Sequence, residues 1–291
     1  MPELPEVETI KLGLEKKIVG LKISKIQILS PKSFIGNPNL VRGKNILKVW
    51  RKGKYLGLDL DEITLLIHLK MSGQLVYDNG KRFIGGHPTA DMVGKMPNSH
   101  TRVIFSFSDP LRPRSEASGS HLYFNDQRKF GWVRVVDSGQ VTVDSSLKKL
   151  GPEPLEKEFS WQILKSNLLH HKSMPIKVAI MDQQVVSGVG NIYANEACFD
   201  AGLDPRTKVG NLTDAQFKKL HSGIIRALRE GIKHGGSTRA HFVDAEGHKG
   251  YFLDYAFVYG RDKHPCKVCN TIIKKIQLGG RGTYFCPKCQ S

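Results

Sequence analysis

The sequence contains no long hydrophobic run and few cysteines, and both absences narrow the classes of protein to consider. The longest apolar stretch, near residues 63–69, is interrupted by His68 and falls far short of the ~20 residues that span a bilayer. The amino terminus carries acidic residues where a signal peptide carries basic ones, so we expect a cytoplasmic protein with no membrane partner. Five cysteines in 291 residues do not form a disulfide framework.

Acidic residues are scarce relative to basic ones. The chain has 44 Lys and Arg against 27 Asp and Glu, which gives a formal net charge of +17. Such an excess favours a polyanionic partner, and the lack of a membrane-binding segment favours nucleic acid. The length suggests about two domains, and 40% hydrophobic residues are enough to build their cores.

The spacing of apolar residues changes along the chain. Val7, Ile10, Leu14 and Ile18 recur at helical spacing, which predicts a first helix that ends at Gly20. Alternation with a period of two then predicts strands at 22–29, 46–50, 55–59, 63–71, 74–77, 102–107, 121–125 and 132–136. Segments 85–99 and 108–120 are rich in turn formers and are predicted loops. Many short strands indicate a β-sandwich or flattened barrel.

The second half of the chain has a helical pattern. Helices are predicted to open at Ser160, at Pro175 and at Thr213, where Thr213 to Gln216 have the form of a capping box. We therefore predict an α+β protein with four parts. These are a β-sandwich domain with an N-terminal helix (1–137), a linker (138–159), a helical domain (160–261) and a four-cysteine hairpin (262–291).

Four of the five cysteines form two C-x-x-C pairs near the end of the chain. Cys266 and Cys269 are separated from Cys286 and Cys289 by sixteen residues. Two such pairs on a β-hairpin can place four thiolates tetrahedrally, so we predict one structural Zn²⁺ with no open coordination position. The fifth, Cys198, is predicted to be a buried, inert thiol in a helix.

Arg281 lies between these pairs, among glycines. Gly279, Gly280 and Gly282 flank it, which predicts a bare hairpin tip with one charge. A solvated arginine and a phosphate contact both fit this placement. The basic composition and the zinc hairpin favour the phosphate contact.

The chain begins with Met-Pro. Removal of Met1 would leave Pro2 with a free secondary amine. Such an amine attacks an aldehyde-level carbon to form an iminium ion, which is an electron sink for elimination. Glu3 or Glu6 could supply the proton that a leaving group needs. Alternatively, these carboxylates only complement the positive end of the first helix.

Together these features resemble the family of bacterial formamidopyrimidine-DNA glycosylases. The segments MPELPEVET, RKGKYL, HLKMSGQL, NDQRKFGWV, LGPEPL and SGVGNIYANEA precede the four-cysteine hairpin in that order. The resemblance covers nearly the whole chain. It implies a base-excision repair enzyme that removes oxidised purines and cuts the strand by β,δ-elimination, with a helix–two-turn–helix domain for DNA.

The resemblance also implies roles for four catalytic residues. Pro2 would attack C1′ of the deoxyribose to form a Schiff base, and Glu3 would be the general acid and base. Lys54 would contact a phosphate and assist β-elimination. Arg281 would bind phosphate and take part in δ-elimination.

Three further residues would fill the gap that an extruded base leaves in the duplex. These are Met71, Arg128, which would pair with the orphaned base, and Phe130, which would wedge beside it. A base inside a duplex must be extruded before it reaches an enzyme's pocket, and flexible or planar side chains suit the space it vacates. Without the resemblance, ordinary core positions are the simpler interpretation of Met71 and Phe130.

His100, Asn191 and Lys172 would contact the DNA backbone. The family often has a basic residue where Ser173 stands, and Lys172 is the candidate to replace it. Asn191 is also predicted to cap the helix that follows it. Thr238 and Arg239 would belong to a loop that folds over the extruded base.

Two other functions stay open. A related class, endonuclease VIII, shares the proline nucleophile but prefers oxidised pyrimidines. Leu4 and the pair Arg128 and Phe130 favour the purine branch. A non-enzymatic zinc-hairpin DNA binder is the third possibility. We expect a monomer whose partner is double-stranded DNA containing oxidised bases.

Overall fold

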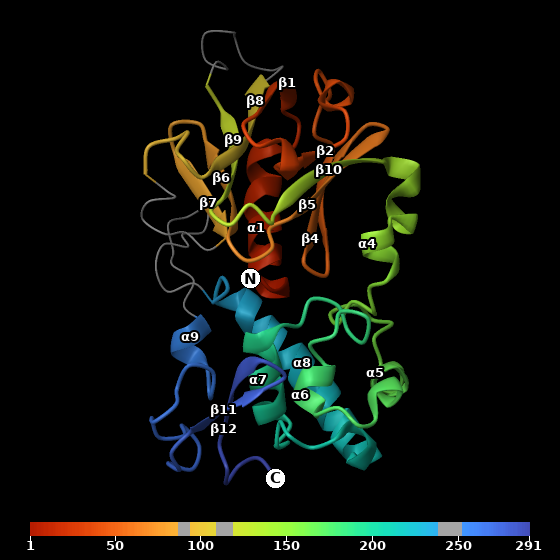
Figure 1. Ribbon diagram of the computed structural model, residues 1–291, viewed down its shortest axis with the longest axis vertical. Helices are drawn as coiled ribbons and strands as arrows, with labels where there is room; N and C mark the ends of the chain where they lie inside the picture. The colour runs from red at the N-terminus through yellow and green to blue at the C-terminus, as the bar shows by residue number, and fades with distance from the viewer. Residues whose placement is uncertain (87–93, 109–118, 238–251) are drawn as a thin grey trace. The chain divides into compact units, whose positions relative to one another are not determined.

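The computed structural model describes residues 1–86, 94–108, 119–237 and 252–291 (Figure 1). The chain divides into two compact units. Unit 1 comprises Met1–Lys148 and Gly235–Gly250, and unit 2 comprises Lys149–His234 and Tyr251–Ser291. No helix within the described ranges is long and apolar enough to cross a bilayer. The boundaries that the sequence predicts for the four parts of the chain remain a prediction.

Unit 1 is a β-sandwich, as predicted, made of two five-stranded sheets. The first has the order β1 (Lys22–Ile28), β8 (Thr101–Ser108), β9 (His121–Asp126), β6 (Gly73–Asp78) and β7 (Arg82–Gly86). The second has the order β2 (Phe34–Ile35), β10 (Trp132–Asp137), β5 (Ile63–His68), β4 (Tyr55–Leu60) and β3 (Lys48–Lys52). All neighbouring strands are antiparallel except the pair of β2 and β10.

The sequence analysis did not predict the edge strands β2 and β7. β2 has two residues, too few for a period to be visible, and β7 ends in two glycines that read as a turn. Gly85 and Gly86 were expected in a loop, and this expectation was wrong. Gly85 pairs with Leu75 of β6, and a Cβ at Gly85 would lie 2.6 Å from Ile10. The close approach of the first helix therefore explains a glycine inside this strand.

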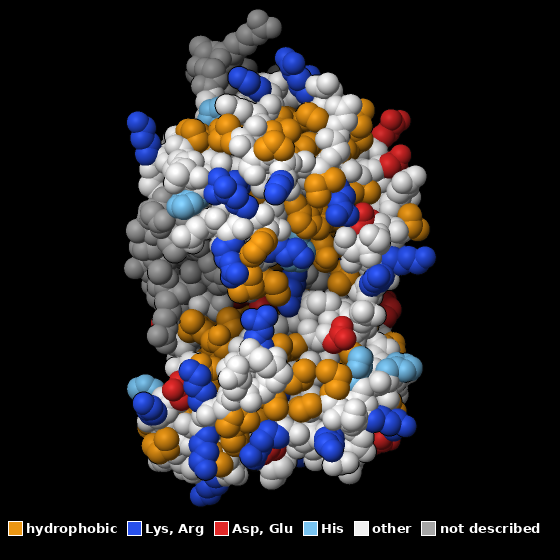
Figure 2. Space-filling view, viewed as in Figure 1, with side chains coloured by type: hydrophobic (Ala, Val, Ile, Leu, Met, Phe, Trp, Pro, Cys, Tyr) orange, Lys and Arg blue, Asp and Glu red, His pale blue; other side chains and the backbone are white. Residues whose placement is uncertain are grey.

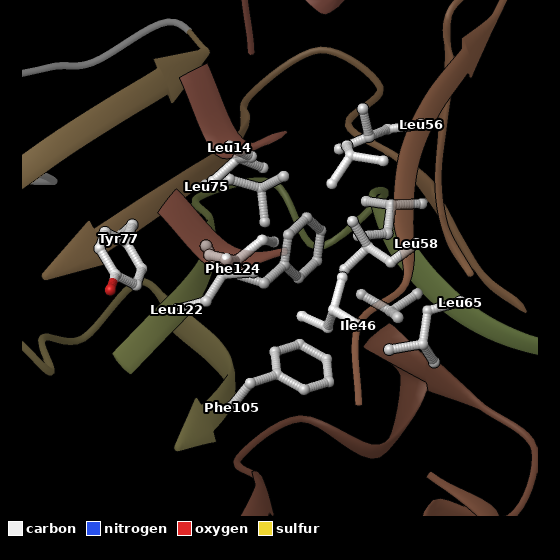
Figure 3. Packing of buried hydrophobic residues seen from close by; sticks show 14 of the residues in the cluster. Leu14, Ile46, Leu56, Leu58, Leu65, Leu75, Tyr77, Phe105, Leu122 and Phe124 are labelled. Carbon is white, nitrogen blue, oxygen red and sulfur yellow. The ribbon is translucent and has the colours of Figure 1, made fainter. Parts of the chain in front are cut away.

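The core of unit 1 lies between the two sheets. Leu75, Leu122 and Phe124 of the first sheet face Leu58 and Leu65 of the second (Figure 3). All five side chains are fully or almost fully buried. Their burial is the main driving force that holds the sandwich closed.

Helix α1 (Leu4–Ile18) packs against β3 and β7, the edge strands on the same side of both sheets. Its apolar face, including Ile10 and Leu14, joins the sandwich core. Gly13 allows this contact, because a Cβ there would lie 2.2 Å from the Phe83 ring. The predicted helix end is confirmed, since Gly20 follows it with φ of +87°.

Unit 2 is mostly helical. Its elements are α5 (Trp161–Leu168), α6 (Ile176–Ala179), α7 (Asn191–Asp200), α8 (Asp214–Lys233), α9 (Phe252–Tyr255), β11 (Lys274–Leu278) and β12 (Arg281–Phe285). Short helix α4 (Ser145–Lys148) closes unit 1, and 3₁₀ turns cover 31–33, 38–40, 138–143, 169–171 and 209–211. The predicted capping box is confirmed, because Gln216 N donates to Thr213 Oγ1 and Thr213 N to Gln216 Oε1.

Glu196 of α7 anchors the segment that leads to the terminal hairpin. Its buried carboxylate accepts hydrogen bonds from the backbone N–H groups of Phe257, Val258 and Tyr259 at 2.8 to 3.0 Å. Burial raises the pKa of this carboxyl, and the three backbone donors oppose that rise. Cys198, on the same helix, is buried as predicted, and burial raises the pKa of its thiol to about 12.

Candidate active site and nucleic-acid interface

The start of α1 shelters the candidate nucleophile and its neighbouring acid. Pro2 is buried, Glu3 is 3% exposed, and Met1 is 38% exposed. Glu6 Oε2 accepts a hydrogen bond from Glu3 N at 2.7 Å, and Glu6 Oε1 accepts one from Ser237 N at 2.9 Å. The Glu6 carboxylate therefore fixes the backbone on which Pro2 and Glu3 stand.

Lys54 lies in the tight turn between β3 and β4, and only 5% of it is exposed. Gly53 precedes it with φ of +55°, a conformation that glycine adopts without strain. Arg51 joins this turn to α1, because its Nε donates to Glu8 Oε2 at 2.7 Å and its Nη1 to Gly53 O at 3.2 Å. The turn that carries Lys54 is thus held against α1, the helix that begins beside Pro2 and Glu3.

His68, in the segment HLKMSG, is a buried titratable residue to which sequence analysis assigned no role. Its ring packs edge-on against Tyr55, with centroids 4.5 Å apart. Burial, followed by the charges of Lys70 and Lys54, lowers the pKa of His68 from 6.5 to about 3. The imidazole is therefore neutral at physiological pH, and its Nδ1 accepts a hydrogen bond from Lys70 N at 2.9 Å.

The three candidate gap-filling residues lie on two neighbouring crossovers between the sheets. Met71 is on the crossover from β5 to β6, and Arg128 and Phe130 are on the crossover from β9 to β10. The crossovers are adjacent because β5 pairs with β10 and β6 pairs with β9. Met71 is 37% exposed and Phe130 is 58% exposed, so neither is an ordinary core residue.

The Arg128 guanidinium lies over the Phe130 ring, with Cζ 5.2 Å from the ring centroid. Such a cation–π contact holds the two side chains together. The face of unit 1 seen in Figure 2 carries several Lys and Arg side chains around hydrophobic ones. A surface of this composition suits phosphates beside an unstacked base.

His100 lies in the turn that precedes β8 and is half-buried. Its backbone N donates to Asn98 Oδ1 at 2.9 Å, and its carbonyl accepts from Asp126 N at 2.9 Å. The turn that carries His100 is thereby joined to the end of β9, one residue before the crossover of Arg128.

In unit 2, Asn191 does not cap α7, so that prediction was wrong. Gly190 occupies the cap position, and Asn191 is the first helical residue. Its side chain instead accepts a hydrogen bond from Lys177 Nζ at 2.5 Å and donates to Gly282 O at 3.2 Å. These long-range partners, one of them on the terminal hairpin, outcompete a local cap and place Asn191 between α6 and β12.

Lys172 and Ser173 are both exposed. The backbone carbonyl of Lys172 accepts from Gly210 N at 2.9 Å, which fixes the chain while leaving the side chain at the surface. Lys177, four residues after Ser173, is fully buried and was missed by the sequence analysis. A buried lysine is uncommon, and its hydrogen bond to Asn191 becomes visible only in the structure.

The four predicted zinc ligands come together. The Sγ atoms of Cys266, Cys269, Cys286 and Cys289 lie within 4.8 Å of one another. Val268 N donates to Cys266 Sγ at 3.4 Å, the kind of bond that supports a thiolate. Four sulfur donors at this separation fit tetrahedral zinc, so the hairpin holds one structural Zn²⁺.

Arg281 is the exposed first residue of β12, directly after the turn rather than within it. Gly279 and Gly280 form that turn with φ of +56° and +70°. A Cβ on Gly279 would lie 2.9 Å from Val178 Cγ2, so the glycine lets the turn pack on α6. Thr238 and Arg239 lie outside the described residues.

Family models match almost the whole chain. Residues 1–133 match the formamidopyrimidine-DNA glycosylase N-terminal domain, residues 150–242 its H2TH domain, and residues 263–291 a zinc finger found in FPG and IleRS. The formamidopyrimidine-DNA glycosylase of Pelotomaculum thermopropionicum is 38% identical over 297 residues, covering 100% of this chain and 99% of that protein. The Bacillus subtilis enzyme is 37% identical over 298 residues, with the same coverage.

Solved structures agree with these matches. A complex of the Lactococcus lactis Fpg with abasic-site DNA has a TM-score of 0.84 at 32% identity and covers 99% of each chain. MutM in complex with DNA containing carbocyclic 8-oxo-G has a TM-score of 0.82 at 32% identity and covers 100% of each chain.

The β-sandwich, the helical domain and the four-cysteine hairpin match, in this order, the domains of a DNA repair glycosylase. The chain belongs to the formamidopyrimidine-DNA glycosylase family. It is therefore a base-excision repair enzyme, a DNA glycosylase with AP lyase activity, and not a simple DNA binder.

Proposed function

We propose that this enzyme excises oxidised purines, 8-oxoguanine and ring-opened formamidopyrimidines, from double-stranded DNA and then cleaves the strand by β,δ-elimination. The observation that carries the proposal is the burial of Pro2 beside Glu3 at the start of α1. A secondary amine in such a place is partly protected from water and stands next to a proton carrier.

The chemistry begins once Met1 has been removed. The lone pair of the Pro2 nitrogen attacks C1′, the bond from C1′ to the base breaks, and the base leaves with the bonding electrons and a proton. The nitrogen passes its own proton to the departing base through Glu3, and opening of the sugar ring, in which O4′ takes a second proton from the Glu3 carboxyl, gives the iminium ion. Glu3 carries protons between these atoms. The iminium then accepts the electrons freed when a proton leaves C2′, so the bond from C3′ to its phosphate breaks.

Lys54 and Arg281 supply positive charge to the phosphates in this proposal. Lys54 assists the first elimination and Arg281 the second, in which the bond from C5′ to its phosphate breaks. Both are cations held by turns that glycines form, Gly53 in one and Gly279 and Gly280 in the other. Fixed cations stabilise a departing phosphate because they need no reorganisation when the bond breaks.

The DNA-binding residues divide into two groups. Met71, Arg128 and Phe130 fill the gap left by the extruded base, and their exposure on adjacent crossovers supports this role. His100, Asn191 and Lys172 contact the backbone. We further propose that the enzyme acts as a monomer in the cytoplasm.

Excision assays test the substrate class. Duplexes with 8-oxoguanine opposite cytosine and duplexes with thymine glycol are compared under single-turnover conditions. We expect faster excision of 8-oxoguanine, with cleavage products that carry phosphate at both ends of the gap. Cleavage of thymine glycol alone would assign the enzyme to oxidised pyrimidines and overturn the proposal.

A further inference from the structure

Asp126 is a fully buried residue at the end of β9 that none of the roles above uses. Its Oδ1 accepts hydrogen bonds from Ser72 Oγ at 2.5 Å and from Arg128 N at 3.1 Å. Its Oδ2 accepts one from Gly131 N at 2.6 Å. One carboxylate therefore holds both ends of the crossover that carries Arg128 and Phe130.

Ser72 links this carboxylate to the other crossover. It follows Met71 directly, and its Oγ donates to Asp126 while accepting a hydrogen bond from Arg128 N at 3.1 Å. The hydroxyl thus bonds to both the side chain and the backbone of the neighbouring crossover. A buried carboxylate with several donors is a strong and directional anchor.

The backbone around these bonds leaves little freedom. Lys70 and Lys129 both have positive φ, +52° and +57°, so each crossover is a tight turn with a defined shape. A Cβ on Gly131 would lie 2.8 Å from the Phe124 ring and 3.1 Å from Asp126 Oδ2. Each turn has a tight backbone shape of its own, and Ser72 and Asp126 join the two turns by hydrogen bonds.

The same residue also reaches the turn of His100. Asp126 N donates to His100 O at 2.9 Å, and Asp126 O accepts from Arg102 Nε at 2.8 Å. Asp126 consequently connects three turns, and each carries a side chain to which we assign a DNA contact.

We propose that Ser72 and Asp126 are positioning residues that couple the two crossovers, so that Met71, Arg128 and Phe130 enter the duplex as one rigid group. The inference rests on the proposed function, because it assumes that these three side chains fill the gap. It adds that the group acts as a unit, held by one hydroxyl and one carboxylate.

Ser72→Ala tests the coupling with the least disturbance to folding. We expect it to slow excision of 8-oxoguanine from a duplex about tenfold, the effect of one hydrogen bond to a charged acceptor. Borohydride trapping on single-stranded abasic DNA should stay unchanged, because that substrate has no stack to fill. Ser72→Thr keeps the hydroxyl and should restore duplex excision. Equal losses on both substrates would indicate a general folding defect and overturn the proposal.

A double-mutant cycle with Phe130→Ala tests whether the coupling crosses from one turn to the other. If Ser72 acts by placing Phe130, the double variant should be little slower than Phe130→Ala alone. Ser106→Ala is the control, since it removes a hydroxyl contact to His121 on the same sheet, and its effect should multiply with that of Phe130→Ala.

These experiments distinguish a failure of the coupling from a failure of the gap-filling role. Multiplicative effects of Ser72→Ala and Phe130→Ala would overturn the coupling and leave the gap-filling role intact. If Met71→Ala and Phe130→Ala both leave duplex excision unchanged, the gap-filling role itself is wrong, and the coupling falls with it.

Discussion

The Glu6 carboxylate accepts the backbone N–H of Glu3 at 2.7 Å, and its second oxygen accepts the N–H of Ser237, 231 residues further along the chain. One side chain thereby fixes the start of α1, where the proposed catalytic residues Pro2 and Glu3 lie, to the segment that precedes Thr238 and Arg239. Glu6 is 1% exposed, so water cannot replace it in either bond.

Glu6→Gln should therefore destabilise the protein by about 1–3 kcal/mol, because an amide offers only one acceptor and leaves one buried N–H facing a donor. Urea unfolding measures this loss. Glu15→Gln is the control, because the Glu15 side chain is on the same helix, is 41% exposed and pairs with Lys11, and this change should alter stability little. A loss for Glu6→Gln no larger than that of the control would contradict the anchoring role.

Loss of zinc should disorder the hairpin and weaken DNA binding at least tenfold, because folding of such a hairpin depends on the metal. Arg281 would lose its fixed position, and Asn191 would lose its bond to Gly282 O. Cys269→Ser should lose both zinc and affinity, whereas Cys198→Ala should keep both. Metal content and DNA affinity are measured on the same samples, and full affinity in zinc-free protein would refute the dependence.

DNA binding should weaken steeply with salt, since several phosphates are neutralised. Arg281→Ala should lower the slope of log K against log salt concentration by about 1. Arg206→Ala is the matched control, because Arg206 is exposed but bonded to Asp204, and it should leave the slope unchanged. An unaltered slope for Arg281→Ala would mean that this residue contacts no phosphate.

His68 should make the protein less stable in mild acid. Folding lowers the pKa of His68 from 6.5 to about 3. Between these two pH values the imidazole is therefore protonated in the unfolded chain and neutral in the folded chain. The contribution of His68 to the free energy of unfolding is fully present above pH 6.5. It declines by at most about 1.4 kcal/mol per pH unit as the pH falls from 6.5 toward 3.

His68→Asn removes this titration while its Oδ1 can still accept from Lys70 N. Urea unfolding at pH 7 and pH 5 should therefore show a smaller difference for the variant than for the parent. Identical pH dependence in the two proteins would show that folding does not lower the pKa of His68.

The local sequence pattern predicted the elements that depend on local physics. The apolar spacing of α1, the capping box at Thr213 that opens α8 and the zinc ligands of the hairpin were all visible without a structure. The edge strands β2 and β7 were missed because they are short or rich in glycine.

The candidate site was predictable only in part, because its support comes from residues far apart in the chain. Asn191 looked like a helix cap, but Lys177 and Gly282 engage its side chain instead. The local sequence did not indicate that Ser72 and Asp126 interact, because 54 positions separate the two residues of this hydrogen bond. Local periodicity reports which face of an element is buried, and it cannot report which polar groups meet across two sheets.

The central claim is that the free amine of Pro2 forms the covalent intermediate. The most direct measurement is borohydride trapping of 8-oxoguanine duplex by two preparations of the full chain, one with Met1 removed and one in which Met1 is retained, each verified by intact mass. We expect a covalent adduct with the first and none with the second, while both bind the DNA. An equal adduct from the chain that retains Met1 would show that another group is the nucleophile and would contradict the account.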